Sequence, residues 1–249
     1  MPKKTADTLE KIVFHLFRAA GAPEDHARAV ANHLIDANLS GHDSHGFIRI
    51  QRYLGEIKKG LVDPKAIPEV VNDNPAFAQI DGHKAFGQVV AKFASEIAIK
   101  KARKWGVSLV TMSNAGHIGR VGAYPELAAR QGMAAIMCFG HIRMGEATSS
   151  SNVAPFGGRE GRLATNPISI AFPRGEESPV LLDFATSVVA AGKIFLYEAR
   201  KETLPDKWLL NKEGVPSDDP SDYHEGALLP LGGLSAGHKG FSLSVIVAL

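Results

Sequence analysis

The sequence predicts an α/β protein with a mainly helical N-terminal region, and two observations support this. From Leu9 to Ile57, apolar residues recur three or four positions apart, which is the spacing of amphipathic helices. From Phe77 onward, short apolar runs of strand length alternate with helical stretches, which is typical of an α/β sheet. Residues 61–74 lie between the two regions and contain two prolines and an Asn-Asp-Asn run, so we interpret them as a connector.

We predict the bounds of the helices and strands from changes in apolar spacing and from the positions of glycine and proline. We expect helices at about 9–17, 27–35, 44–60, 88–105 and 121–131, one starting after Ser187 and one starting near Gly240. We expect strands at 77–80, 107–112, 133–139, 168–172 and 180–184, and a polar loop at Glu146–Asn152. Thr186 and Ser187 could cap the helix that follows them or contact a ligand, and Asn166-Pro167 is typical of a turn.

Composition excludes several classes of function. The formal net charge of +2 is too small to indicate nucleic-acid binding, and we interpret the basic cluster Lys100–Lys104 as a solvated helix end. The single cysteine, Cys138, rules out an internal disulfide and is expected in the core. No apolar run reaches the roughly 20 residues that span a bilayer. We therefore expect a cytoplasmic protein that binds neither nucleic acid nor membrane.

Two stretches carry groups suited to catalysis. In Ser113–Arg120, a predicted strand-to-helix turn places glycines beside His117 and Arg120, which could move a proton and meet an anion. In the other stretch, His45 and Arg49 share a face if their helix begins near Ser44, because they are four residues apart. Ser44 could equally cap that helix.

The glycine spacing argues against a Rossmann nucleotide site. Gly116-His-Ile-Gly-Arg-Val-Gly122 has the pattern GxxGxxG, and no acidic residue stands about 20 positions on at the end of a following strand. The sequence contains no Walker loop and no HExxH motif, and His42 and His45 have no obvious third ligand. We expect no metal site.

Seven stretches in order along nearly the whole chain resemble the malate/L-lactate dehydrogenase family of NAD(P)-dependent oxidoreductases that lack the Rossmann fold. They are His42-Asp-Ser-His-Gly46 with Arg49 and Tyr53, Gly116-His-Ile-Gly-Arg120, Val153-Ala-Pro-Phe-Gly-Gly-Arg-Glu160, Thr165-Asn-Pro167, Leu182-Asp-Phe-Ala-Thr-Ser187, Leu228-Leu-Pro-Leu-Gly-Gly233 and His238-Lys-Gly-Phe241. The first two are most similar to the hydroxycarboxylate dehydrogenase B branch.

This resemblance implies a fold and an organisation. The implied fold is a non-Rossmann three-layer (α/β/α) mixed-sheet NAD(P)-binding domain joined to a mainly helical N-terminal domain, as in sulfolactate dehydrogenase. Residues 1–74 would form the substrate and dimerisation domain, 75–225 the NAD(P)-binding domain, and 226–249 the start of a segment returning to the first. The family implies a homodimer.

The resemblance also implies roles in the oxidation of a 2-hydroxy acid, which requires a base, a cation for the carboxylate and a held nicotinamide. His45 would move the proton, with Ser44 and Asp183 as a relay, and His117 is the rival base. Arg49 would bind the carboxylate, and Tyr53 and Thr165 would contact the substrate.

NAD or NADP is the implied cofactor, and the resemblance places its contacts in three segments. Residues implied to bind it are His117, Gly119, Arg120, Val121, Leu182, Asp183, Phe184, Ala185, His238 and Lys239. Strand ends and helix starts can offer N–H groups or a cation to phosphate. On this basis, Arg120→Ala should weaken cofactor binding.

The sequence ends at Leu249 in an apolar helical pattern without a capping glycine or a polar stop, whereas family members continue. We expect that a subunit covers this surface or that the chain is a fragment. Two hypotheses follow: a dehydrogenase of a small 2-hydroxy or 2-oxo acid, with an imino-acid reductase as a variant, or a weakly active or inactive relative that binds nucleotide or another chain.

Overall fold

The computed structural model describes residues 4–140 and 152–249, and its contacts divide the chain into two compact units. The first unit comprises Met1–Ala135 and Phe172–Val180, and the second comprises Ile136–Ala171 and Leu181–Leu249. The domain boundaries expected at residues 74 and 225 stay a prediction. The expected polar loop lies outside the described residues, except for Asn152.

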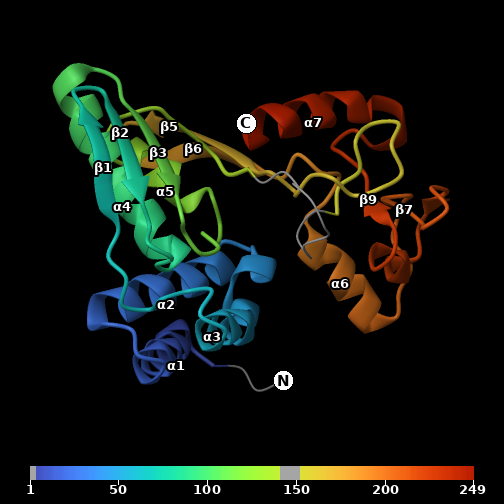
Figure 1. Cartoon of the computed structure of the whole chain (residues 1–249), viewed down its shortest axis with the longest axis horizontal. Coiled ribbons are helices and arrows are strands. Elements are labelled where there is room, and N and C mark those ends of the chain that lie inside the picture. The colour runs from blue at the N-terminus through green and yellow to red at the C-terminus, as the bar shows by residue number, and fades with distance from the viewer. Residues whose placement is uncertain (1–3, 141–151) are drawn as a thin grey trace. The chain divides into compact units, whose positions relative to one another are not determined.

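Three α-helices open the first unit (Figure 1): α1 (Ala6–Ala19), α2 (Glu24–Leu39) and α3 (Ile50–Lys58). Thr5 begins α1 because its side chain accepts the Thr8 N–H, which an N-terminal turn otherwise leaves unpaired. The buried rings of Phe17 and Phe86 pack edge to face, with centroids 5.5 Å apart, and Tyr53 lies in the same core. This core fixes the position of Tyr53 on α3.

A mixed sheet and one long helix complete most of the first unit. Strands β1 (Glu69–Asn74) and β2 (Phe77–Asp81) are antiparallel, and β2 pairs in parallel with β3 (Leu109–Ser113). Helix α4 (Gly87–Trp105) connects β2 to β3, and α5 (Ala123–Ala129) follows β3. The expected βαβ alternation is confirmed. The connector prediction is wrong for residues 69–74, because β1 is an exposed edge strand without the apolar alternation that would reveal it.

The rest of the chain contains, in order, β4 (Ala135–Cys138), β5 (Ile168–Arg174), β6 (Glu177–Phe184), α6 (Ala191–Arg200), β7 (Leu209–Leu210), β8 (Pro216–Ser217), a 3₁₀ turn at Pro220–Tyr223, β9 (Ala227–Leu228) and α7 (Gly233–Ala248). The hairpin end of β5 and β6, Phe172–Val180, belongs to the first unit, and the other ends of these two strands belong to the second. Strands β4, β5 and β6 form one sheet, and β8, β7 and β9 form another. The core of the second unit gathers around Ile194, Leu209 and Leu228.

The helix expected after Ser187 is present, but one proposed cap and one expected helix start are wrong. Helix α6 begins at Ala191, and Ser187 does not cap it, because its hydroxyl donates to the carbonyl oxygen of Val189 at 2.7 Å. Helix α7 begins at Gly233 rather than near Gly240. Its glycines have low intrinsic helix propensity, but the backbone of Gly240 lies so close to Leu231 that a side chain would clash there. Packing therefore overrides propensity in α7.

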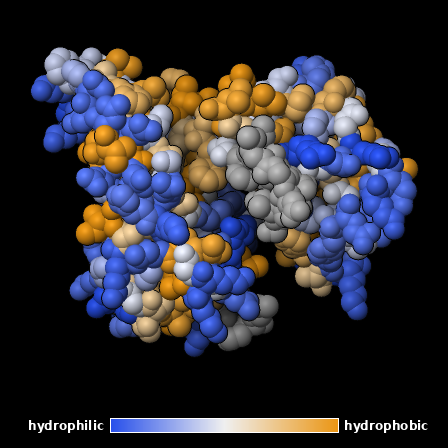
Figure 2. All heavy atoms as spheres, in the orientation of Figure 1, coloured by the Kyte–Doolittle hydropathy of each residue, from blue (hydrophilic) through white to orange (hydrophobic). Residues whose placement is uncertain are grey.

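Surface features correct one further expectation. Cys138 is exposed rather than buried, because it lies on the outward face of β4. Among the described residues, no helix combines the length and the apolar character needed to cross a membrane. Figure 2 shows hydrophilic residues interspersed with hydrophobic ones on the face drawn.

Candidate active site

The glycine-rich stretch forms the loop between β3 and α5, and its backbone continues the pairing of β2 with β3. The Lys84 N–H donates to the Asn114 carbonyl at 2.7 Å, and the Gly116 N–H donates to the Ala85 carbonyl at 2.9 Å. At the start of α4, a Cβ on Gly87 would overlap the Gly116 carbonyl oxygen and the His117 backbone. Only glycine allows this approach, which sets His117 against α4.

His117 and His45 meet in this unit. Their rings stack with centroids 5.6 Å apart and an interplanar angle of 15°. The Nδ1 atom of His45 lies 2.9 Å from the hydroxyl of Ser44, and the Nδ1 atom of His117 lies 2.7 Å from the hydroxyl of Tyr53. The structure thus places the predicted base and its predicted rival side by side.

His45 and Arg49 do not share one helix, so that expectation is wrong. Two short 3₁₀ turns, Asp43–His45 and Phe47–Arg49, precede α3 and are separated by Gly46. Gly46 lies against the Asn38 side chain of α2, which accepts the Phe47 N–H at 2.7 Å and so fixes the break between the turns. In the part of the chain that the structure describes, no side chain caps α3, so the capping role considered for Ser44 is also wrong.

Arg49 still comes close to both histidines. Its Nε donates to the Ser44 carbonyl oxygen at 2.5 Å. Burial lowers the pKa of His45 to about 3, and the charge of Arg49 is the next contribution. Burial, followed by the same charge, also holds the pKa of His117 well below its ordinary value. Both rings keep part of their surface open to solvent, yet each is neutral at pH 7.

Arg120 lies beneath the loop rather than on its surface. Only 4% of its side chain is exposed, and its guanidinium contacts Asp36 of α2 at 2.6 Å and Glu126 of α5 at 3.5 Å. Its backbone N–H donates to Nε2 of His33 at 2.9 Å. Helix α2 therefore clamps the loop twice, through His33 and Asp36.

The cofactor contacts expected from Gly119, Arg120 and Val121 stay predictions, and their surroundings bear on them. Gly119 has a φ of +78°, its N–H points to the His117 ring, and a Cβ would overlap His33. Val121 is buried. In the described arrangement, the polar groups of this loop are directed inward.

The remaining predicted residues belong to the second unit. Leu182, Asp183 and Phe184 end β6, Ala185 follows it, and exposed His238 and Lys239 lie in α7. The carbonyl oxygen of Thr165 accepts both the N–H and the hydroxyl of Thr186, at 2.9 and 3.1 Å. The relay from His45 through Ser44 to Asp183 stays a prediction, as do the contacts of these residues with substrate and cofactor.

Three residues near the loop were not anticipated: His33, Asp36 and Gln88. All are polar residues of helices α2 and α4, and nothing in their spacing distinguishes them from surface positions. Gln88 is only 2% exposed, and its Nε2 donates to the Tyr53 hydroxyl at 2.9 Å. Only the tertiary structure reveals these contacts.

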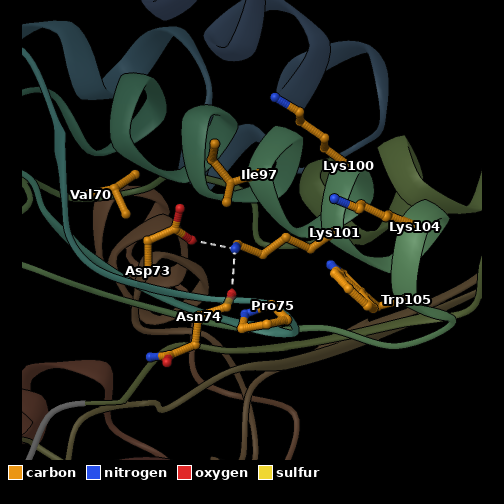
Figure 3. A pocket seen from close by; sticks show the side chains of 9 residues that line it. All are labelled: Val70, Asp73, Asn74, Pro75, Ile97, Lys100, Lys101, Lys104 and Trp105. Atoms are coloured by element: carbon orange, nitrogen blue, oxygen red, sulfur yellow. Dashed lines mark hydrogen bonds and ion pairs between the residues drawn. The ribbon is translucent and has the colours of Figure 1, made fainter.

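A separate hollow of about 380 Å³ lies between the end of β1 and α4 (Figure 3), and it contains no predicted site residue. Lys101 projects into it and pairs with Asp73, and its Nζ donates to the Asn74 carbonyl at 2.6 Å. Lys101 is mostly buried by this pairing, so the solvated-face interpretation is wrong for this residue. None of the residues that line this hollow is a histidine or a cysteine.

Comparison with known proteins identifies a family. The family model described as malate/L-lactate dehydrogenase matches residues 5–249. A malate dehydrogenase of Pyrococcus abyssi is 39% identical over 97% of this chain, and hydroxycarboxylate dehydrogenase B of Escherichia coli is 37% identical over 97%. The chain spans 65% of the length of each of these two relatives.

A solved structure supports the fold. The sulfolactate dehydrogenase of Methanocaldococcus jannaschii matches with a TM-score of 0.85 and 38% identity, over 98% of this chain and 67% of that one. This match confirms the predicted fold class, a mixed-sheet α/β protein of the sulfolactate dehydrogenase type with a helical N-terminal region.

Proposed function

The chain belongs to the malate/L-lactate dehydrogenase family, and we propose that it transfers a hydride between NAD or NADP and a small 2-hydroxy or 2-oxo carboxylic acid. The observation that carries this proposal is the stacked pair of neutral imidazoles, His45 and His117, beside the guanidinium of Arg49. Oxidation of a hydroxy acid needs a neutral base and a nearby cation, and the first unit supplies both.

His45 is the residue that takes the hydroxyl proton in this proposal. Because the pKa of His45 lies near 3, its ring is unprotonated before substrate binds. When Nδ1 donates to the Ser44 hydroxyl, Nε2 carries the lone pair that accepts the proton. Burial and Arg49 disfavour the imidazolium that forms, so the reaction requires a group that stabilises it, and the predicted relay assigns this role to Asp183.

Arg49 would hold the substrate carboxylate. A guanidinium suits this group because its planar donors can bind two carboxylate oxygens together. Binding an anion would also offset the charge that lowers the pKa of His45. Carboxylate binding and proton transfer are therefore coupled in this site.

The chemistry of the available donors fits a dinucleotide best in the second unit. His238 and Lys239 are exposed in α7, and the lysine ammonium is a cation that favours phosphate. A bound nicotinamide would supply the hydride acceptor. We assign cofactor contacts to Leu182, Phe184 and Ala185, and substrate contacts to Thr165 and Tyr53, as the resemblance implies.

We also propose that the protein acts as a homodimer in the cytoplasm, by analogy with its family. Light scattering of the purified chain tests the dimer directly. A monomer at micromolar concentration would count against it.

Coenzyme oxidation tests the main proposal. Absorbance of NADH and NADPH would be followed with oxaloacetate, pyruvate, sulfopyruvate and a cyclic imino acid, and we expect saturable turnover with at least one 2-oxo acid. Arg49→Met removes the proposed carboxylate contact and should raise KM strongly for these acids. Saturable quenching of coenzyme fluorescence without turnover would favour a nucleotide-binding relative, and the absence of both would overturn the proposal.

A further inference from the structure

The Nδ1 atom of His117 faces two hydrogen-bond partners. The Gly119 N–H points at it from 3.3 Å, and the Tyr53 hydroxyl oxygen lies 2.7 Å away. The direction of a backbone N–H is set by the planar peptide, so this donor cannot turn away. An N–H cannot donate to another N–H, and Nδ1 must therefore carry a lone pair.

The lone pair on Nδ1 of His117 determines the hydrogen-bond roles of Tyr53 and Gln88. Because Nδ1 accepts, the Tyr53 hydroxyl must donate its single proton to it, and the phenol oxygen is then an acceptor. Nε2 of Gln88 lies 2.9 Å from that oxygen and donates to it. If the oxygen of the Gln88 amide faced Tyr53 in place of the nitrogen, the Tyr53 hydroxyl would donate its proton to Gln88. Nδ1 of His117 would then receive no hydrogen bond from Tyr53. The Gly119 N–H therefore fixes the donors: the Gln88 amide donates to the Tyr53 oxygen, and the Tyr53 hydroxyl donates to Nδ1 of His117.

We propose that Gln88 is a positioning residue that acts through Tyr53 to hold His117 as the Nε2–H tautomer. In this form, the loop histidine donates a hydrogen bond and does not serve as the base. The position of Gln88 is itself constrained, since it follows Gly87, where the start of α4 touches the His117 backbone. Gln88 is buried, and its Oε1 has no partner among the described residues, which is consistent with a side chain held by its amide nitrogen.

This inference rests on the proposed function only for its consequence. A neutral imidazole N–H can polarise a substrate carbonyl or hold a hydroxyl oxygen without taking its proton. His117 would therefore orient the reacting oxygen, and His45 would exchange the proton with it. The stacked histidines would have different roles.

Nitrogen NMR of the protein labelled with ¹⁵N-histidine tests the tautomer without substrate or cofactor. At pH 7 we expect His117 to show a lone-pair signal at Nδ1 and an N–H signal at Nε2. His33 provides an internal reference of opposite sense, because its Nε2 accepts the Arg120 N–H and its proton must lie on Nδ1. His117→Gln and His33→Gln assign the two sets of signals. A proton on Nδ1 of His117 would overturn the proposal.

Two variants test whether Tyr53 and Gln88 hold the His117 tautomer. Tyr53→Phe should move the two His117 signals toward each other, because only the longer Gly119 contact remains. Gln88→Leu should move them the same way by less and lower kcat by about tenfold, with cofactor affinity unchanged. The His33 signals should stay in place in both variants, which reports an intact fold. Unmoved His117 signals in folded Tyr53→Phe would contradict the proposal.

The outcomes separate this inference from the proposed function. The expected tautomer in a protein without turnover would leave the inference standing and remove the dehydrogenase proposal. Turnover in a protein whose His117 carries its proton on Nδ1 would do the reverse.

Discussion

The loop at residues 116–120 and the segment around His238 and Lys239 were both expected to meet the cofactor, yet they are built differently. In the loop, the Gly119 N–H, the Arg120 N–H and the Arg120 guanidinium all contact groups of the same unit. In α7, His238 and Lys239 are exposed. The loop is suited to fixing the orientation of a catalytic ring, whereas α7 presents charge that a ligand from solution can reach.

The largest effect should come from removing the base. We expect His45→Ala to lower kcat/KM by about 10²- to 10⁴-fold, the range for loss of a general base, with cofactor affinity unchanged. Steady-state kinetics and fluorescence titration measure the two quantities. His15→Ala, at an exposed position of α1, is the control and should match the wild type. A minor loss in His45→Ala together with a large loss in His117→Ala would make the loop histidine the base.

The next largest effect should come from breaking the ion pair between Arg120 of the loop and Asp36 of α2. Removing Asp36 should destabilise the protein more than removing Arg120. Asp36→Ala leaves the buried Arg120 guanidinium with Glu126, at 3.5 Å, as its one acidic partner among the described residues, so unfolding should become easier by about 3 kcal/mol. Arg120→Met fills a similar volume and leaves Asp36, which is 52% exposed, so it should cost about 1 kcal/mol.

Urea unfolding measures both changes. Asp25→Ala, at an exposed position of the same helix, should cost less than about 1 kcal/mol. If Arg120→Met proved the more damaging variant, or if it weakened coenzyme binding while leaving stability intact, the inward role of Arg120 would be wrong.

A smaller effect should distinguish α7 from the loop. We expect Lys239→Met to weaken NADH or NADPH binding by about tenfold, as for the loss of one exposed charged contact to phosphate. Because the side chain is exposed, the unfolding free energy should not change. Lys212→Met, which removes another exposed lysine of the second unit, is the matched control. Equal coenzyme affinity in the two variants would argue against a phosphate contact at Lys239.

Most of the fold was predictable because it depends on local patterns. Apolar spacing located α1, α2, α4 and the paired strands β2 and β3 to within a few residues. Edge strand β1 and the start of α7 were missed, because one exposes almost every side chain and the other contains glycines whose helical state depends on packing.

The sequence singled out residues of the candidate site but not the contacts between them. Sequence alone indicated His45, Arg49 and His117 because their chemistry is distinctive. It gave no sign that Arg120 would turn toward Asp36 or that Gln88 would reach Tyr53. Those contacts join residues from separate helices, and no local rule specifies which polar side chain of a helix faces inward.

The smallest expected effect concerns pH, and it tests how firmly the histidines are buried. In the unfolded chain, histidine has a pKa near 6.5, whereas in the folded protein the pKa of His45 is about 3 and that of His33 about 4, chiefly because of burial. Between these limits the unfolded state binds more protons than the folded state. The contribution of these histidines to the free energy of unfolding should therefore be fully present above about pH 6.5. It should fall steadily as the pH drops toward 3.

Removing one of these histidines should reduce that dependence. We expect His45→Gln to lose less unfolding free energy than the wild type when the pH is lowered from about 7 to about 5, because glutamine takes up no proton in either state. His15→Gln, at an exposed position, should behave as the wild type does. His33 and His117 retain their own contributions, so the pH dependence should shrink without vanishing. An unchanged slope in His45→Gln would mean that the folded protein does not hold the pKa of His45 below its ordinary value.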